Sequence, residues 1–368
     1  MEERRFIGID LAKRTYVMRI ENQSDSFGLT ICGKTDTAGI EKMLGNINKS
    51  DQVAFEAGTQ TFNLARLIIS RKGCLVHVFN PWKLAIIFKS TKKTDFEDAR
   101  KLTWLLKRFP VEELPTVNLP SKKEEERRML ISERISKKKL RNKLINRLHS
   151  LFFREGITHI MRKDVIIPNN RNRVILSLQG RTQSEAKRIL EEIDLLERHI
   201  SLIDKEIKED LQKDPIAVNL LTIPGVGITT AMTYLAHIGD GSRFDSGQHV
   251  SSYVGITPRV DNSGDTIRMG SITKRGCVAI RGIIIQSAWA AVHAKKPNRF
   301  QKKYQELMIR RGKARAIVAI ARRILEMMWI VGSRQIWYNE TSKEDLIKKL
   351  TRLGLMDMTK QVLGEPAA

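Results

Sequence analysis

Four carboxylates in the first part of the chain have residue types and positions typical of a metal site. Asp10 directly follows the apolar run FIGI, and Glu56 directly follows the run QVAF. Asp95 and Asp98 lie three residues apart at the start of an amphipathic segment, so they share one face of a helix. Because strand ends of an α/β sheet converge on one edge, all four acids can meet there. Such a group requires a counter-charge, and Mg²⁺ ions take carboxylate oxygens and organise phosphoryl transfer.

Structural roles compete with this interpretation for each acid taken singly. Thr94 and Glu97 fit a capping box, which makes Glu97 a helix-capping residue rather than a ligand. Asp95 would also stabilise the first turn of a helix by opposing its dipole. Asp10 differs, because the end of a buried strand is a costly place for a charge without a task.

A glycine-rich basic stretch, GITPRVDNSGDTIRMGSITKRGC, spans residues 255–277. It places the hydroxyl of Ser263 among four cations: Arg259, Arg268, Lys274 and Arg275. Arginine clamps phosphate oxygens in bidentate fashion, lysine adds a point charge, and a serine attacks a phosphate only when its proton is removed. From the residues alone, plain phosphate binding is the favoured interpretation, with Ser263 a turn residue before Gly264.

The segment LLTIPGVGITTAMTYLAHIGD predicts a helix, a Pro-Gly-Val-Gly turn and a second helix. This order resembles a helix-hairpin-helix element, in which a glycine-rich turn presents backbone N–H groups to a phosphate. We expect Gly225 and Gly227 to lie at such a nucleic-acid contact.

The composition favours a polyanionic partner. The 368 residues include 65 Lys and Arg against 41 Asp and Glu, which gives a net charge of +24. Three cysteines without a CxxC pair support neither a disulfide framework nor a structural zinc site. No window approaches the apolar length of a membrane span, so we expect a cytoplasmic protein with no membrane contact.

The pattern of elements predicts four parts. Residues 1–115 alternate strands and helices and predict an α/β domain with a mixed sheet. After the proline-punctuated linker FPVEELPTVNLP, residues 116–213 predict two long helices in an antiparallel coiled-coil hairpin. Residues 214–340 predict a second, mainly α-helical domain, and residues 341–368 a C-terminal tail.

Both ends of the chain resemble one known family. GIDLAKRTY, FEAGTQ and KTDFEDARKL carry Asp10, Glu56, Asp95 and Asp98 and are similar to the RuvC-like domain of IS110-family transposases, an RNase H-fold domain with a DEDD tetrad. The segment from LLTIPGVG to RGIIIQSA is similar to that family's second conserved domain. The resemblance is weakest through the helical middle.

The resemblance implies a DNA transposase or recombinase that cleaves and rejoins strands through a phosphoserine. Family members carry a doubled serine in the basic stretch, whereas Asn262 occupies the first place here, which leaves Ser263 as nucleophile and Ser271 as a distant second. The resemblance further implies Mg²⁺ at the tetrad, with Mn²⁺ as a substitute, and donor and target DNA as substrates. It also implies a non-coding guide (bridge) RNA, a dimer or tetramer with active sites shared between subunits, and a nucleoid-associated location in a bacterium.

Two other functions remain open. A Holliday-junction-type RuvC-like nuclease would use the acidic tetrad to activate water, with the C-terminal domain only binding DNA. A non-catalytic nucleic-acid-binding protein would use the acids structurally, and its affinity would fall steeply with salt for every sequence.

Overall fold

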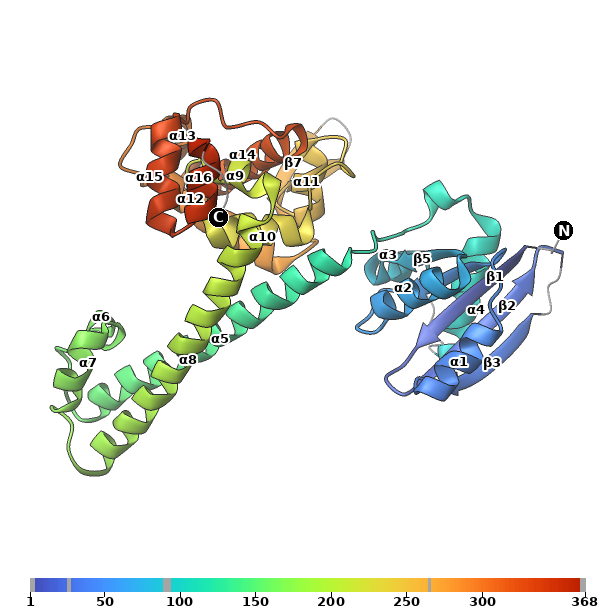
Figure 1. The fold of residues 1–368 in the computed structure, drawn as a ribbon, viewed down its shortest axis with the longest axis horizontal. Coiled ribbons are helices and arrows are strands. Elements are labelled where there is room, and N and C mark those ends of the chain that lie inside the picture. Colours follow the sequence, from blue (N-terminus) through green and yellow to red (C-terminus); the bar gives the residue numbers. More distant parts are fainter. Residues whose placement is uncertain (1–3, 25–27, 89–93, 264–265, 365–368) are drawn as a thin grey trace. The chain divides into compact units, whose positions relative to one another are not determined.

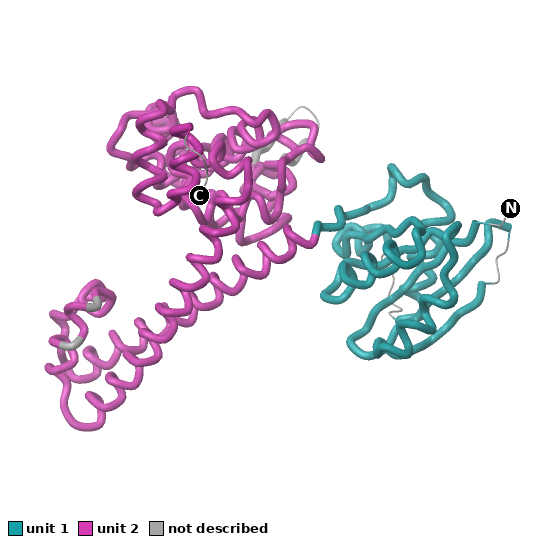
Figure 2. The backbone as a smooth tube through the Cα atoms, viewed as in Figure 1, with its two compact units in different colours: residues 1–121 teal, residues 122–368 magenta. Residues whose placement is uncertain are grey.

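The computed structural model describes residues 4–24, 28–88, 94–263 and 266–364, of which the side chains of residues 168, 172 and 260–269 are excluded. The chain forms two compact units, residues 1–121 and 122–368 (Figure 2). Within the described residues, no helix combines the length and apolar character needed to cross a membrane.

The first unit is built on a five-stranded sheet. Its strands are β1 (Arg5–Leu11), β2 (Thr15–Asn22), β3 (Leu29–Lys34), β4 (Gln52–Glu56) and β5 (Leu75–Phe79), in the order β3-β2-β1-β4-β5. The pairs β1–β2 and β2–β3 are antiparallel, whereas β1–β4 and β4–β5 are parallel. The predicted mixed sheet is therefore confirmed, and the arrangement is compatible with an RNase H-like fold.

Helices cover both faces of this sheet (Figure 1). Ile7 and Ile9 of β1 pack in one core with residues of α1 (Thr37–Gly45) and α2 (Thr61–Lys72). Phe6, one register position away, packs in a second core with residues of α3 (Pro81–Ile87) and α4 (Asp95–Arg108). Because side chains alternate along a strand, Gly8 and Asp10 belong to the α4 face with Phe6. A short 3₁₀ helix, η1 (Val111–Glu113), follows α4.

The second unit begins with two long antiparallel helices, α5 (Lys122–Arg154) and α8 (Gly180–Gln212), which lie side by side in Figure 1. Their opposed direction follows from three ion pairs whose members run in opposite order along the two helices: Arg127–Asp210, Arg134–Asp204 and Arg147–Glu185. Helices α6 (Arg162–Ile166) and α7 (Pro168–Ile175) connect them. The predicted helical pair is thus present, and coiled-coil packing stays a prediction.

The remainder of the second unit is mainly helical, as expected. Its elements are α9 (Pro215–Thr222), α10 (Ile228–His237), α11 (Gly247–Val254), β6 (Pro258–Ser263), β7 (Thr266–Ile272), α12 (Val278–Val292), α13 (Arg299–Arg311), α14 (Lys313–Arg334), α15 (Lys343–Leu353) and α16 (Met356–Leu363). Residues 341–368, expected as a tail, contribute Leu346, Leu350 and Met358 to the core shared with α14. The basic stretch, expected as a loop, includes the antiparallel hairpin β6–β7.

Candidate functional site

Asp10 and Glu56 lie at the same edge of the sheet in the first unit. Asp10 follows Ile9 in β1, and Glu56 follows Phe55 in β4. Ile9 and Phe55 are paired with each other in these adjacent parallel strands. Neighbouring parallel strands place residues at the same level on the same face. The strand-end argument from the sequence therefore holds for these two acids.

Helix α4 brings Asp98 to this edge because Gly8 permits a close approach. A Cβ atom on Gly8 would lie 2.2 Å from the Ala99 carbonyl oxygen and 2.5 Å from Thr103 Oγ1. Any larger residue at position 8 would push α4 away from β1. Asp98 immediately precedes Ala99 in the sequence, so this contact sets how near Asp98 comes to the strand ends.

Glu56 and Asp98 line one pocket, of about 230 Å³, together with Pro81, Leu84, Ala85, Phe88, Lys101 and Leu102. Lys101 Nζ donates a hydrogen bond to Asp98 Oδ1 at 2.8 Å and lies 5.8 Å from the centre of the Phe88 ring. Lys101 is thus the protein's own counter-charge for Asp98. The sequence carried a signal for it, because Asp98 and Lys101 are three residues apart on a helix.

The other two acids near the N-terminus of α4, Glu97 and Asp95, have different surroundings. Thr94 Oγ1 accepts from the Glu97 backbone N–H at 3.3 Å, which confirms Thr94 as the N-cap. The Glu97 carboxylate forms an ion pair with Arg100 at 2.9 Å. Asp95 is the exposed first residue of α4, one helical turn before Asp98.

Asp10 and Glu56 share an edge of the sheet, and Glu56 shares a pocket with Asp98. Within the described ranges, no three His, Cys, Asp or Glu residues are grouped closely enough to hold a metal ion. The donors are hard oxygens of the kind that divalent cations prefer, and Glu56 and Asp98 face a common space. Lys101 and a cation held there would compete for the Asp98 carboxylate.

The β6–β7 hairpin places the backbone of the predicted serine in the second unit. Ser263 ends β6 opposite Thr266, and Asp261 lies opposite Arg268 of β7. The side chains of Ser263 and Arg268 lie outside the described residues, so their roles stay predictions. Ser271 is an exposed residue of β7.

The base of this hairpin is tightly packed. Gly255 has φ +74°, and a Cβ atom on it would lie 1.8 Å from the Arg275 carbonyl oxygen. The buried Arg281 guanidinium donates to the carbonyl oxygens of Val254 and Gly276, both at 2.9 Å. The sequence analysis missed this arginine, which fixes the chain on both sides of the hairpin.

Three predicted phosphate-binding cations, Arg259, Lys274 and Arg275, are exposed around this base. His237 Nε2 lies 3.6 Å from Cys277 Sγ, just after the basic stretch. Burial, with smaller contributions from Arg128 and Arg243, lowers the pKa of His237 to about 4. His237 is therefore neutral near pH 7, and its location fits a packing residue.

The Pro224–Gly227 turn lies between α9 and α10. Gly225 has φ +81°, and a Cβ atom on it would lie 2.2 Å from the Ser287 carbonyl oxygen of α12. Gly227 is the N-cap of α10, has no side-chain cap, and faces open space where a Cβ would be. The turn therefore packs on α12 through Gly225 and leaves its Gly227 side accessible. Its helix-hairpin-helix identity stays a prediction.

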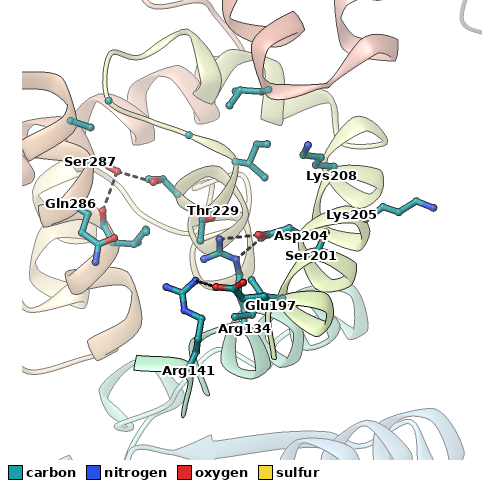
Figure 3. Close-up of a pocket in the computed structure, with 18 residues that line it drawn as sticks. Arg134, Arg141, Glu197, Ser201, Asp204, Lys205, Lys208, Thr229, Gln286 and Ser287 are labelled. Carbon is teal, nitrogen blue, oxygen red and sulfur yellow. Dashed lines mark hydrogen bonds and ion pairs between the residues drawn. The ribbon is translucent and has the colours of Figure 1, made fainter. Parts of the chain in front are cut away.

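A pocket of about 770 Å³, which we name the helix-pair pocket, lies between this turn, α12 and the long helices α5 and α8 (Figure 3). Arg134 pairs with Asp204 at 2.5 Å, and Arg141 lies 3.7 Å from Glu197. Lys205 and Lys208 add positive charge along the α8 wall. The sequence analysis did not identify these residues.

Two family models match separate parts of the chain. Residues 7–154 match the model of the IS110-type DEDD transposases, described as "Transposase". Residues 217–305 match the model described as "Transposase IS116/IS110/IS902 family". The first match includes the acidic edge, and the second includes the Pro224–Gly227 turn and the hairpin.

Individual relatives carry related names. The chain is 29% identical to the "Probable family 20 transposase" of Pseudomonas aeruginosa over 41% of this chain and 46% of the relative. It is 33% identical to the "Transposase for insertion sequence element IS1111A" of Coxiella burnetii over 39% and 41%, respectively. It is 36% identical to the "Pilin gene-inverting protein" of Moraxella bovis over 30% and 35%. Each of these matches spans less than half the length of the relative.

Proposed function

We propose that the chain is a DNA recombinase of an insertion sequence and a member of the IS110 family of transposases, whose models match it in two places. The observation that carries the proposal is the pair of transposase matches, one over the acidic edge and one over the basic hairpin. Relatives named as transposases and as a gene-inverting protein support strand cleavage and rejoining as the activity.

In the proposed mechanism, Ser263 forms a covalent link to DNA. Its Oγ attacks the scissile phosphorus and a P–Oγ bond forms as the bond to the leaving sugar oxygen breaks. The proton lost by Ser263 is balanced by the proton gained at that sugar hydroxyl. A hydroxyl of another strand then attacks the phosphoserine, which restores Ser263 and joins the new strand. The number of phosphodiester bonds is conserved, so no external energy source is needed.

The cations of the hairpin and its base would bind the phosphate. We propose that Arg259, Arg268 and Arg275 hold phosphate oxygens and that Lys274 adds a point charge. Arg281 supports this role indirectly, because it ties Val254 to Gly276 at 2.9 Å and so keeps the hairpin base in one shape. Gly225 and Gly227 would provide a second backbone contact.

The DEDD transposase match supports dependence on a divalent metal in general, and we propose Mg²⁺, with Mn²⁺ as a substitute. Asp10, Glu56, Asp95 and Asp98 would hold it. When bound, such ions neutralise phosphate charge and help to deprotonate a hydroxyl. The chain's own contribution is to keep the acids on one edge through the Gly8–Ala99 contact.

Substrates and assembly follow from the same proposal. Donor and target DNA would be chosen by pairing with a non-coding guide RNA, while the protein, with its net charge of +24, grips nucleic-acid backbones. The active protein would be a dimer or tetramer in which the acidic edge of one subunit serves Ser263 of another.

The test is the Ser263→Ala variant, assayed for cleavage and for a protein–DNA adduct that survives denaturation. The recombinase loses both, whereas the Ser271→Ala control keeps both. If Ser263→Ala still cleaves and no adduct forms with the native protein, the nuclease function is correct instead. If Asp10→Ala also leaves every activity unchanged, the acids are structural.

A further inference from the structure

A second pocket, which we name the C-terminal pocket, lies against the same Pro224–Gly227 turn. Its volume is about 780 Å³, and its walls are the turn, the segment from Lys295 to Asn298 and helix α15. It shares Gly225 and Gly227 with the helix-pair pocket, so the turn contributes to two pockets. The family match ends at residue 305, so α15 lies beyond it.

The lining of the C-terminal pocket is strongly cationic. It contains two carboxylates, Glu340 and Asp345, against five Lys and Arg side chains: Lys295, Lys296, Lys348, Lys349 and Arg352. The Asp345 carboxylate accepts hydrogen bonds from Lys296 Nζ and from Ser342 Oγ. The Glu340 carboxylate pairs with Arg299 at 2.9 Å. Lys296 is engaged with Asp345, and Lys349 donates to backbone carbonyl groups, so the lining cations that remain to meet a ligand are Lys295, Lys348 and Arg352.

Helix α15 presents two exposed cations to this pocket. Lys348 and Arg352 are four residues apart, so they lie on one face of the helix. Leu346 and Leu350 occupy the opposite side and are fully buried in the core. The packing of these leucines fixes the rotation of α15 and so directs Lys348 and Arg352 outward.

Hydrogen bonds join the C-terminal segment to the residues just before the turn. Lys349 Nζ donates to the carbonyl oxygens of Leu221 at 2.5 Å and Ile223 at 3.0 Å, directly before the turn. Thr341 Oγ1 donates to the Thr222 carbonyl oxygen at 2.8 Å. Burial of Lys349 lowers its pKa to about 7. Because burying an ammonium group costs free energy, the Lys349 hydrogen bonds are a specific structural link between α15 and the segment before the turn.

We propose that the C-terminal pocket binds backbone phosphates of a nucleic-acid strand, with Lys348 and Arg352 as the phosphate contacts. Three observations agree on this ligand: the cationic excess, the concave shape, and the adjacent turn whose Gly227 leaves the first N–H groups of α10 without a side-chain cap. The shared chemistry is the phosphodiester group, and DNA and RNA are its two sources. The site is independent of strand cleavage and of Ser263.

The experiment compares two double variants of the full chain. Lys348→Gln/Arg352→Gln removes the proposed contacts from α15, and Lys343→Gln/Lys360→Gln removes two cations outside the pocket lining, one from α15 and one from α16. Affinity is measured by fluorescence anisotropy with a random-sequence DNA duplex and with a single-stranded RNA, over a series of salt concentrations. EDTA is present throughout, so cleavage does not contribute.

We expect the pocket variant to weaken binding about tenfold or more and to reduce the slope of log K against log salt by about two, since each lost phosphate contact reduces it by about one. The control variant should change affinity less than about twofold, in line with the loss of diffuse charge alone. Loss with one probe only identifies DNA or RNA as the source. Equal affinities and slopes for the two variants with both probes would overturn the proposal, whatever the Ser263→Ala assay shows.

Discussion

Gly8 of β1 lies in direct contact with the backbone of Ala99 in α4. A Cβ atom at position 8 would lie only 2.2 Å from the Ala99 carbonyl oxygen, which is inside any allowed contact. The absence of a side chain at Gly8 therefore sets the distance between α4 and the sheet. Asp98 adjoins Ala99, and Asp10 lies two residues after Gly8. The Gly8–Ala99 contact therefore helps to set the distance between Asp10 on the strand and Asp98 on the helix.

Gly8→Ala tests that coupling. The atoms nearest to the added methyl group are the Ala99 carbonyl oxygen and the Oγ1 and backbone N of Thr103. Because these residues belong to α4, the methyl group must displace the helix. We expect a loss of stability of about 1–3 kcal/mol, as for other overpacked sites, together with weaker metal-dependent cleavage. Thermal unfolding and cleavage assays measure the two effects. Gly45→Ala, whose added Cβ would meet no other part of the chain within 4 Å, is the matched control: it should not lower stability and should leave cleavage unchanged.

Lys101 should compete with metal binding at Asp98. Its Nζ lies 2.8 Å from Asp98 Oδ1, and both side chains are largely buried. Removing an ion pair worth about 1 kcal/mol predicts that Lys101→Met binds Mn²⁺ about fivefold more tightly, whereas Asp98→Asn binds it more weakly. Titration calorimetry in the absence of DNA measures this affinity.

The neighbouring Arg100 supplies the control for that experiment. Arg100 pairs with Glu97 on the same helix and is more exposed than Lys101. Arg100→Met removes one positive charge, as Lys101→Met does. Its Mn²⁺ affinity therefore reports the long-range electrostatic effect of losing that charge, without loss of the Asp98 ion pair. Equal Mn²⁺ affinities for the Lys101 and Arg100 variants would show that no competition takes place at Asp98.

Arg127 joins α5 to the end of α8 and the start of α9. Its side chain is only 5% exposed, and its guanidinium contacts Asp210 at 2.5 Å and Asp214 at 2.7 Å. Asp214 also caps α9 by accepting from the Ile216 N–H. Arg127→Met would leave two carboxylates without their main partner, so we expect a loss of about 3 kcal/mol in urea unfolding.

The Asp214→Asn change separates charge from capping in that network. Asparagine keeps an oxygen for the Ile216 N–H but removes one of the two charges that face Arg127. Added to Arg127→Met, it should recover part of the lost stability. A double variant less stable than Arg127→Met would mean that packing of the arginine stem, rather than uncompensated charge, dominates.

Much of the first unit was predictable because its signals are local. Alternation in β1 separates Ile7 and Ile9 from Phe6 and Asp10, and this pattern alone places Asp10 on the opposite face from one apolar core. The strand-end rule then placed Asp10 beside Glu56 correctly. Thr94 was identified as a cap for the same reason, since its partner Glu97 is three residues away.

The second unit was less predictable because its contacts join distant residues. Lys349 bonds to carbonyl groups nearly 130 residues earlier, at Leu221 and Ile223, and no periodicity within α15 indicates such partners. The β6–β7 hairpin was missed because PRVDNS lacks the alternation of apolar residues that marks a strand. Backbone pairing with β7 stabilises it instead.

The buried Lys349 makes the stability of the second unit depend on pH. Burial lowers its pKa from 10.5 to about 7, with a smaller contribution from Arg352. Between these two values the unfolded chain binds a proton that the folded chain does not, so stability rises with pH, by at most about 1.4 kcal/mol per pH unit. Below about pH 7 both the folded and the unfolded state carry the proton, and this dependence ends.

Urea unfolding of the native protein and of Lys349→Met, across pH 7 to 9, measures this effect. The curves of unfolding free energy against pH should diverge as pH rises. Lys343→Met, at the exposed start of the same helix, should follow the native protein in parallel. Parallel curves for Lys349→Met would mean that Lys349 stays charged in the folded protein, held by the carbonyl groups of Leu221 and Ile223.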